Sequence, residues 1–375
     1  MRQIERSIFD LRRGVPVLVR GRDRDTLVAP LEGLTDETLT RLRATTGNPP
    51  ALVVTRHRLE RMGIEIAADA ARLSLTDGDS AQTVVAWACA RHVEHSPHQR
   101  PTDVDRESHA ALALMRRGLL IPAAVTATID ASRREAVQKL IDDQTLLAID
   151  VDRIEAYESS AIHFLRRISA ADVPLADAEK SRFVLFREAD GVREHIAIVI
   201  GEPEFWRTAV PVRLHSACLT GDLFGSLRCD CGEQLRSSVA TIAERGGGVL
   251  LYLAQEGRGI GLANKLRAYS LQDDGLDTVD ADQVLGFGDD ERDYNVALEM
   301  LAQLEIRRIE LLTNNPAKIA AMSGGGIAVV QRSGVYGRLT AQNERYLTAK
   351  AARSGHWLDN VLGKPSADVA MNGKG

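Results

Sequence analysis

The sequence predicts a mixed α/β (α+β) fold of two domains, each a mixed sheet with packed helices. The chain has 375 residues, which is more than one ordinary hydrophobic core requires. In both halves, short apolar runs of strand length alternate with amphipathic stretches of helical length. The segment 169–180 contains Pro174, has little periodicity and is expected to be a linker. We therefore expect domains at residues 1–170 and 171–362, followed by a small, polar tail at 363–375 that is expected to be disordered.

The first half opens with a helix and then a strand. Ile4, Ile8 and Leu11 recur at helical spacing, and Gly14 can end the helix. The apolar run 15–19 is typical of a short buried strand. The pattern continues, with helices expected around 35–44, 58–62, 110–115 and 133–142 and strands at 51–54 and 123–129. This half is therefore expected to mix helices and strands.

The second half begins with strand-like runs at 183–186, 195–200 and 210–214. A helix is expected over 233–245, because the three glycines that follow it accept the left-handed conformation that ends helices. The run 249–253 is expected to be the next strand. Glycine, cysteine and charged residues are dense around these elements, which is typical of a functional site.

Composition and charge exclude several classes of protein. Hydrophobic residues make up 44% and charged residues 26%, the balance of a soluble globular protein. No stretch approaches the roughly 18 apolar residues of a membrane helix, and the N-terminus lacks the apolar block of a signal peptide. The net charge of -5 gives no general attraction to phosphate backbones. We expect a cytoplasmic protein with a small-molecule substrate, no nucleic-acid partner and no membrane partner.

Three of the four cysteines, Cys218, Cys229 and Cys231, lie within fourteen residues. Three thiolates suit zinc, and a site with only three protein ligands leaves a position open for water, as catalytic zinc sites do. Such a zinc ion activates water at neutral pH. Two alternatives remain open: the cysteines can be reduced core residues, and His215 can be a fourth ligand.

Further polar segments lie downstream of the cysteines. The run Gln255-Glu-Gly-Arg-Gly-Ile-Gly-Leu follows the strand at 249–253, and its glycines permit close approach to an anion that Arg258 can pair with; an ordinary glycine-rich turn is the alternative. The run Asp289-Asp-Glu-Arg-Asp can serve proton transfer or simply place negative charge at a helix start. The run 311–318 is a strand followed by a polar turn, and Lys318 can hold a phosphate.

Six motifs, taken in this order, closely resemble those of GTP cyclohydrolase II. They are His215-Ser-Ala-Cys-Leu-Thr-Gly-Asp, Leu227-Arg-Cys-Asp-Cys-Gly, Gln255-Glu-Gly-Arg-Gly-Ile-Gly-Leu, Gly286-Phe, Asp290-Glu-Arg-Asp and Leu312-Thr-Asn-Asn-Pro. The resemblance covers about 171–359. It implies the first step of riboflavin biosynthesis: zinc-dependent hydrolysis of GTP that opens the guanine imidazole ring and releases formate and pyrophosphate. The implied product is 2,5-diamino-6-(5-phosphoribosylamino)pyrimidin-4(3H)-one.

The resemblance also implies roles for individual residues. Cys218, Cys229 and Cys231 would bind one Zn²⁺, Asp290 would accept a proton, Arg292 would attack the α-phosphate, and Tyr269 would lie near the reacting ring. Because a guanidinium is normally protonated, stabilisation of charge by Arg292 is an equal alternative. Mg²⁺ would accompany the triphosphate, and a homodimer is expected. The implied GTP contacts are Arg213, Leu214, His215, Ser216, Ala217, Gln234, Glu256, Gly257, Arg258, Thr278, Thr313 and Lys318.

Two features depart from the patterns of known families. Ala217 stands where GTP cyclohydrolase II usually has a glutamate. The first half more faintly resembles 3,4-dihydroxy-2-butanone 4-phosphate synthase, through Arg117-Gly-Leu-Leu-Ile-Pro-Ala-Ala-Val, but the synthase's acidic loop would fall at 19–29, where most carboxylates are missing. Its Gly-His-Thr-Glu motif is also absent, with only Asp105-Arg-Glu-Ser-His109 nearby. We expect this domain to lack synthase activity and to have a structural or regulatory role.

Two other functions remain open from the sequence. Ala217 and the altered first half are compatible with a homologue that turns GTP over only in part, for example by opening the ring without losing formate. The same residues are compatible with a non-catalytic zinc protein that senses a purine nucleotide.

Overall fold

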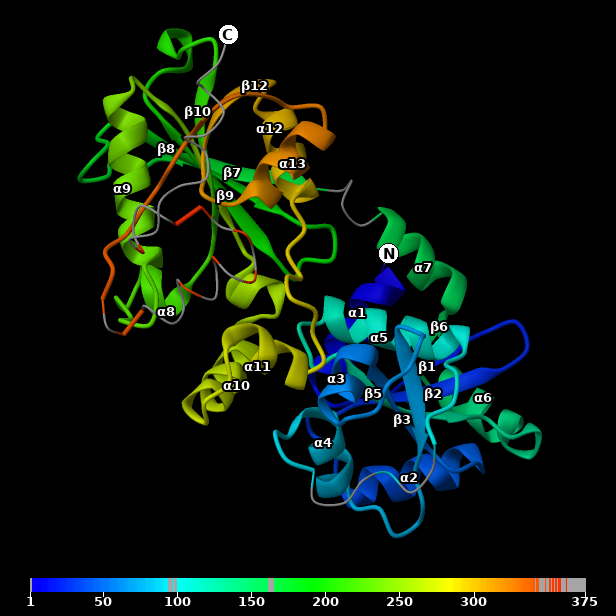
Figure 1. Ribbon diagram of the computed structural model, residues 1–375. Coiled ribbons are helices and arrows are strands. Elements are labelled where there is room, and N and C mark those ends of the chain that lie inside the picture. The colour runs from blue at the N-terminus through cyan, green and yellow to red at the C-terminus, as the bar shows by residue number, and fades with distance from the viewer. Residues whose placement is uncertain are drawn as a thin grey trace, which may run out of the picture. The chain divides into compact units, whose positions relative to one another are not determined.

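The computed structural model (Figure 1) describes residues 2–93, 97, 100–160, 165–340, 342, 343, 348, 351, 353, 355, 357, 358 and 362. The tail expected at 363–375 lies outside the described residues. The chain divides into two compact units, each built from two segments. The first unit comprises Met1–Ala161 and Ile260–Glu291, and the second comprises Ile162–Gly259 and Arg292–Gly375.

The first unit is built on a six-stranded mixed sheet with the order β4-β3-β5-β2-β1-β6. Pairing within this sheet is antiparallel except between β1 and β6, which are parallel. Its strands are β1 (Val17–Arg20), β2 (Asp25–Pro30), β3 (Ala51–Thr55), β4 (Ala70–Ser74), β5 (Ala123–Thr128) and β6 (Ala148–Asp150). β3 and β5 are buried almost throughout, which fits their apolar sequences.

Helices cover this sheet and complete the first unit. From the N-terminal segment come α1 (Arg2–Arg12), α2 (Asp36–Thr46), α3 (Arg56–Arg61), α4 (Ala81–Cys89), α5 (Arg106–Arg117), α6 (Arg134–Asp142) and α7 (Val151–Ser160). The second segment adds α10 (Leu262–Asp273) and α11 (Thr278–Val284). The core of this unit includes Leu52, Leu73 and Trp87, which are fully buried.

The second unit is built on a seven-stranded mixed sheet with the order β13-β12-β10-β11-β9-β8-β7. The pairs among β10, β11, β12 and β13 are parallel, whereas β7, β8 and β9 join in antiparallel fashion. Its strands are β7 (Arg166–Asp172), β8 (Ser181–Arg187), β9 (Glu194–Ile200), β10 (Val210–Ser216), β11 (Gly248–Leu253), β12 (Arg308–Leu312) and β13 (Ala328–Ser333). The predicted mixed α/β fold with two domains is confirmed.

Both faces of the second sheet are covered by helices (Figure 1). Val239 and Ile242 of α9 (Cys231–Glu244) pack in one apolar cluster with Leu250. Val249 and Leu251, which point to the other face, share a cluster with residues of α12 (Asn295–Gln303) and α13 (Pro316–Gly324). Since side chains alternate along a strand, this arrangement requires a strand that is apolar on both sides, as β11 is.

The boundary between the units differs from the sequence-based expectation. The predicted break at 170/171 falls inside β7, which pairs with β8 in the second sheet. The expected linker at 169–180 therefore begins as a strand. β7 is an edge strand, exposed along almost its whole length, so it lacks the apolar pattern by which strands are predicted. The segment 260–291, expected within the second domain, belongs to the first unit.

None of the helices in the described part of the chain has the length and apolar character needed to cross a membrane.

Candidate functional site

Three neighbouring strands of the second sheet end at the same edge. β10 pairs in parallel with both β11 and β12, so their carboxyl ends face the same way. The loops that follow begin at Ala217, Ala254 and Thr313. Ligands of open α/β sheets bind outside the carboxyl ends of parallel strands. The loops that carry the predicted site residues therefore lie at the edge of the sheet where the topology favours ligand binding.

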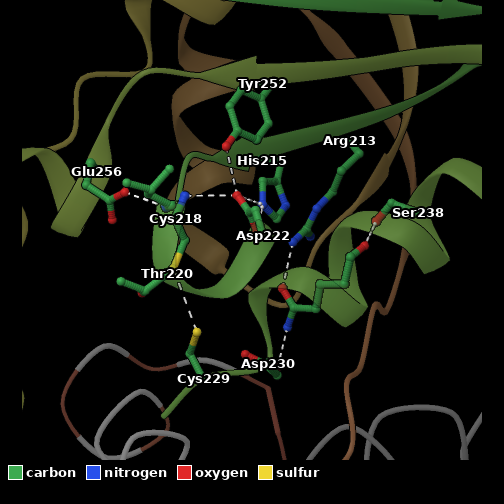
Figure 2. A network of polar contacts seen from close by, with 12 residues as sticks. Arg213, His215, Cys218, Thr220, Asp222, Cys229, Asp230, Ser238, Tyr252 and Glu256 are labelled. Atoms are coloured by element: carbon green, nitrogen blue, oxygen red, sulfur yellow. Dashed lines mark hydrogen bonds and ion pairs between the residues drawn. The ribbon is translucent and has the colours of Figure 1, made fainter. Parts of the chain in front are cut away.

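The thiol groups of Cys218, Cys229 and Cys231 converge in the loops and helices after β10. Their sulfur atoms lie within 4.8 Å of one another, and the Sγ atoms of Cys218 and Cys229 are 3.7 Å apart (Figure 2). In a tetrahedral zinc site with Zn–S bonds of about 2.3 Å, the sulfurs are about 3.8 Å apart. The hydrogen bond with Cys218 raises the pKa of Cys229 to about 11, so a cation has to displace a proton there. Donor type and spacing both fit a metal ion.

His215 is not part of this cluster. Among the described residues, the group that can hold a metal consists of the three cysteines, and the Nε2 atom of His215 instead lies 3.1 Å from an oxygen of Asp222. The alternative of a fourth ligand at His215 is thus not supported by the geometry. Three ligands leave a coordination position for a further group.

Gly221 makes room for the three thiols. It is buried in the short helix α8 (Leu219–Asp222), and a Cβ atom there would lie 2.7 Å from the sulfur of Cys229 and 3.1 Å from that of Cys218. Gly232 is the second residue of α9, and it also has no room for a side chain. A Cβ atom there would lie 2.3 Å from the Gly221 carbonyl oxygen. These two glycines let α8 and α9 approach closely, which brings the three thiols together.

Asp222 fixes both the backbone of Cys218 and the ring of His215. Its Oδ2 accepts hydrogen bonds from the backbone N–H of Cys218 and from the Tyr252 hydroxyl, both at 2.9 Å (Figure 2). The His215 ring stacks on Tyr252 with 5.6 Å between centroids. Sequence reasoning missed Asp222 and Tyr252 as functional residues. The one available signal was the position of Asp222, four residues after Cys218 in the first motif.

Replacing Asp222 by asparagine is expected to weaken metal binding about tenfold, within the range typical of residues that orient metal ligands. The amide has one acceptor oxygen instead of two, so it can no longer accept from the Cys218 N–H, the Tyr252 hydroxyl and the His215 ring together, and the backbone of Cys218 loosens. The affinity is measured by titrating metal-free protein with Zn²⁺ against a chromophoric chelator. Unchanged affinity would show that the carboxylate does not orient the cysteine.

Burial lowers the pKa of His215, although Asp222 opposes the shift. The imidazole is therefore neutral at pH 7, and its contact with the carboxylate assigns the proton to Nε2. The Nδ1 atom is then an acceptor. This nitrogen is buried and has no hydrogen-bond partner among the described residues.

Arg213 is a buried cation in the centre of β10. Its Nη1 donates to the Leu312 carbonyl at 3.0 Å and its Nη2 to Oε1 of Gln234 at 2.8 Å, while Gln234 donates in turn to Asp230 at 2.5 Å. Burial lowers the pKa of Arg213 to about 10, which leaves the guanidinium charged at neutral pH. The structure thus joins two of the predicted substrate contacts, Arg213 and Gln234, in one network.

Several buried polar atoms at this edge have no hydrogen-bond partner among the described residues. They are Nε of Arg213, Nδ1 of His215, Oγ of Ser216 and Oε1 of Gln255. A buried polar group left unpaired costs about 1–3 kcal/mol. Four such atoms on β10 and on the loop after β11 indicate a polar ligand that satisfies them. The Arg213 nitrogen is a donor, the His215 nitrogen and the Gln255 oxygen are acceptors, and the Ser216 hydroxyl can be either.

Two further cations lie near one aromatic ring. Lys318, which is buried, donates from Nζ to the backbone carbonyl of Leu214 at 2.7 Å, and its Nζ lies 5.9 Å from the centre of the Tyr294 ring. The guanidinium of Arg292 lies 5.7 Å from the same ring centre. Thr313 is also buried, and its hydroxyl accepts from the backbone two residues further on. Positive charge therefore accumulates beside the strand ends, as an anionic ligand requires.

The loop after β11 returns toward the first cysteine. Oε2 of Glu256 accepts from the backbone N–H of Leu219 at 2.6 Å. Gly257 and Arg258 have φ angles of 63° and 61°, in the left-handed region, which is strained for an arginine. Such strain is common at ligand sites. Ala217, at the end of β10, donates its backbone N–H to the last residue of β11.

Three predicted site residues belong to the first unit. Tyr269 lies on α10 with Nζ of Lys265 5.6 Å from its ring centre, Thr278 is the first residue of α11, and Asp290 follows α11. The structure therefore gathers the cysteines and twelve of the other predicted residues in the second unit and these three in the first.

Comparison with known proteins shows which family the sequence is similar to. Residues 166–334 match the model of the GTP cyclohydrolase II family. A GTP cyclohydrolase-2 of Xylella fastidiosa (strain 9a5c) is 44% identical over 356 residues, which are 95% of this chain and 87% of the relative. A GTP cyclohydrolase-2 of Buchnera aphidicola is 45% identical over 194 residues, which are 52% of this chain and 97% of the relative, so family members of about half this length exist.

Among solved structures, a two-domain 3,4-dihydroxy-2-butanone 4-phosphate synthase from A. baumannii matches with a TM-score of 0.37 and 17% identity, over 89% of this chain and 99% of that one.

Proposed function

Because the chain belongs to the GTP cyclohydrolase II family, we propose that it hydrolyses GTP with the help of one Zn²⁺ held by Cys218, Cys229 and Cys231. The reaction opens the guanine imidazole ring, releases formate and pyrophosphate, and yields 2,5-diamino-6-(5-phosphoribosylamino)pyrimidin-4(3H)-one for riboflavin biosynthesis. The observation that carries the proposal is the convergence of three thiols at the carboxyl edge of the sheet. Bound by three thiolates, zinc supplies Lewis-acid activation of water at neutral pH.

The chain's own residues bind and orient the nucleotide. Arg213 and Lys318 provide buried positive charge for the triphosphate, which binds with Mg²⁺. The neutral His215 and the Ser216 hydroxyl, which has no partner in the described part of the chain, are hydrogen-bonding groups for the purine ring. Glu256, Gly257 and Arg258, together with Leu214, Ala217, Gln234, Thr278 and Thr313, complete the proposed substrate contacts.

Asp290 and Arg292 are the proposed catalytic pair, with Tyr269 near the reacting ring. Asp290 accepts a proton during ring opening. Arg292 has two proposed roles: attack on the α-phosphate, or stabilisation of the charge that develops there. Its proximity to the Tyr294 ring favours a charged guanidinium, because a cation over an aromatic face is attracted by the ring. We therefore favour charge stabilisation.

The N-terminal region is proposed to lack synthase activity. Asp105, which falls in the segment where the synthase motif is missing, forms ion pairs with Arg72 at 2.8 Å and with Arg24 at 3.4 Å. A carboxylate neutralised by two arginines is a poor ligand for a divalent cation. We further propose a homodimer, which the family resemblance implies, and a cytoplasmic location.

The test is an assay of the purified protein with GTP, Mg²⁺ and Zn²⁺ that measures formate, pyrophosphate and the mass of the product. Formate and pyrophosphate in equal amounts are expected, together with the diaminopyrimidine. Ala217, which stands beside Cys218 where the family usually has a glutamate, supports a second candidate, partial turnover. A product that retains the formyl carbon would replace the first proposal by the second, and GTP binding without turnover would contradict both.

A further inference from the structure

The insert, defined here as residues 260–291, carries Tyr269, Thr278 and Asp290 and packs in the first unit. Its helices α10 and α11 enclose an apolar cluster that includes Leu271, Val284 and Phe287. α11 also packs against α3 of the N-terminal region (Figure 1). The insert and residues 1–161 belong to the same unit, so the contacts between them lie within one compact body.

Arg58 joins the insert to two elements of the N-terminal region. It is 1% exposed, and its guanidinium donates to the carbonyls of Trp87 at 2.7 Å, of Ala86 at 2.9 Å and of Val284 at 3.1 Å. These carbonyls lie in the last turns of α4 and α11, where helix ends carry partial negative charge. Arg58 therefore ties the C-terminal end of α11 to α4 with one buried cation.

Thr55 holds the turn that follows α11. Its hydroxyl donates to the Gly286 carbonyl at 2.7 Å, and both residues are buried. Gly286 has a φ of +88°, and a Cβ there would lie 3.2 Å from the Thr55 oxygen and 3.3 Å from Pro122. The turn is thus fixed both by its backbone conformation and by close packing on β3 and the residues before β5. It directs the chain toward Asp290, four residues on.

A relay of polar side chains runs from α3 to the residue before Asp290. Arg61 donates from Nε to Oε1 of Gln283 at 3.0 Å, and it also forms an ion pair with Asp280. Gln283 donates from Nε2 to Oδ1 of Asp289 at 2.9 Å. Because Arg61 can only donate and a carboxylate can only accept, the Gln283 amide has one orientation that serves both.

A fourth contact fixes the residue after Asp290. Oε1 of Glu291 accepts from the backbone N–H of Gly288 at 2.8 Å, and Oε2 lies 3.5 Å from Nε of Arg116 on α5. Asp290 therefore stands between two carboxylates, Asp289 and Glu291, that are each held by side chains or backbone within the first unit.

We infer that the N-terminal region positions the insert for catalysis, with Thr55, Arg58 and Arg61 as positioning residues that act through α11 and Asp289 on the placement of Asp290. This inference rests on the proposed function, in which Asp290 accepts a proton. Misplacement of a reacting group by about 1 Å can cost up to a hundredfold in rate. Loss of one contact in this set therefore lowers kcat without removing any group that touches GTP.

The sharpest test is Gln283→Glu. The new carboxylate still accepts from Arg61 and strengthens that contact, so the anchoring of α11 is kept, but it repels Asp289 instead of donating to it. We expect kcat to fall about tenfold, with KM for GTP and the thermal midpoint changed little. A purely structural role for Gln283 predicts no loss of kcat, because the contact with Arg61 is retained.

A second pair of variants tests the buried contact. Thr55→Val removes the hydrogen bond to Gly286 and is expected to lower kcat roughly tenfold. Thr55→Ser keeps the hydroxyl and is expected to retain the wild-type kcat. Arg56→Ala is the control: Arg56 follows Thr55 directly as the first residue of α3, but its side chain is 39% exposed and its ion pairs go to Glu60 and Asp69. Full kcat in both Gln283→Glu and Thr55→Val would overturn the inference.

Hydrogen exchange separates this inference from the proposed function. Amides of 284–291 are expected to exchange faster in Thr55→Val than in the wild type or Arg56→Ala, whether or not GTP is turned over. Wild-type protein that neither opens the guanine ring nor releases formate would contradict the proposed function. Unchanged exchange in Thr55→Val would contradict the anchoring itself.

Discussion

Replacing Cys229 by serine is expected to reduce GTP turnover by at least about a thousandfold and to leave less than one zinc per chain. Serine removes one of three thiolates, and a hydroxyl is a poor ligand for zinc at neutral pH, so the remaining pair cannot hold the ion in a tetrahedral site. Zinc content is measured in the purified variant by atomic spectroscopy, and turnover by formate release.

Cys89→Ser is the matched control for this experiment. Cys89 lies on α4 in the first unit, outside the thiol cluster, and its sulfur donates to the Val85 carbonyl at 3.3 Å, a contact that a hydroxyl keeps. This variant is expected to retain full zinc and full activity. Wild-type zinc content in Cys229→Ser would mean that other ligands hold the metal, and the assignment of the three cysteines would be wrong.

Replacing Gly221 by alanine is expected to weaken zinc binding about a hundredfold, an effect comparable to the loss of a residue that orients metal ligands. The added methyl group would lie 2.7 Å from the sulfur of Cys229 and 3.1 Å from that of Cys218. Metal-free thiols can rotate away, but a bound ion holds them in place. Most of the cost therefore falls on the metal complex, and a smaller part falls on the fold, because the Cβ atom of Cys231 would lie 3.0 Å away and cannot rotate.

The stability of the metal-free variant checks this reasoning. Alanine is favoured over glycine inside a helix by about 1 kcal/mol, which offsets the close contact with the Cβ atom of Cys231, so the metal-free Gly221→Ala protein is expected to unfold near the wild-type midpoint. Gly324→Ala in α13 is the control, since nothing lies within 4 Å of a Cβ built there. Equal zinc affinity in Gly221→Ala and the wild type would contradict the proposed packing of the three thiols.

Local patterns in the sequence predicted individual elements well. The apolar run 183–186 lies within β8, and the helix expected over 233–245 is α9, which begins two residues earlier, at Cys231. The spacing of the cysteines predicted a cluster of thiols, which the structure contains. In each case the signal lies in residues close together in the sequence.

Long-range packing could not be predicted in the same way. The insert is rich in helix-forming residues, but nothing in its periodicity says that Gly286 accepts from Thr55, more than two hundred residues earlier. The role of Asp222 likewise depends on Tyr252, which is adjacent only because β10 and β11 pair. Such contacts are set by the topology of the sheet, to which a single sequence gives no direct access.

The division of the first unit into two chain segments affects the order in which it can be completed during synthesis. About 100 residues of the second unit separate Ala161 from Ile260. At roughly 5–20 residues per second, a ribosome needs on the order of 5–20 s to produce them. Throughout that interval Arg58 lacks the Val284 carbonyl and Thr55 lacks the Gly286 carbonyl. The surface of the nascent N-terminal region that packs against the insert therefore stays uncovered until the insert has been synthesised.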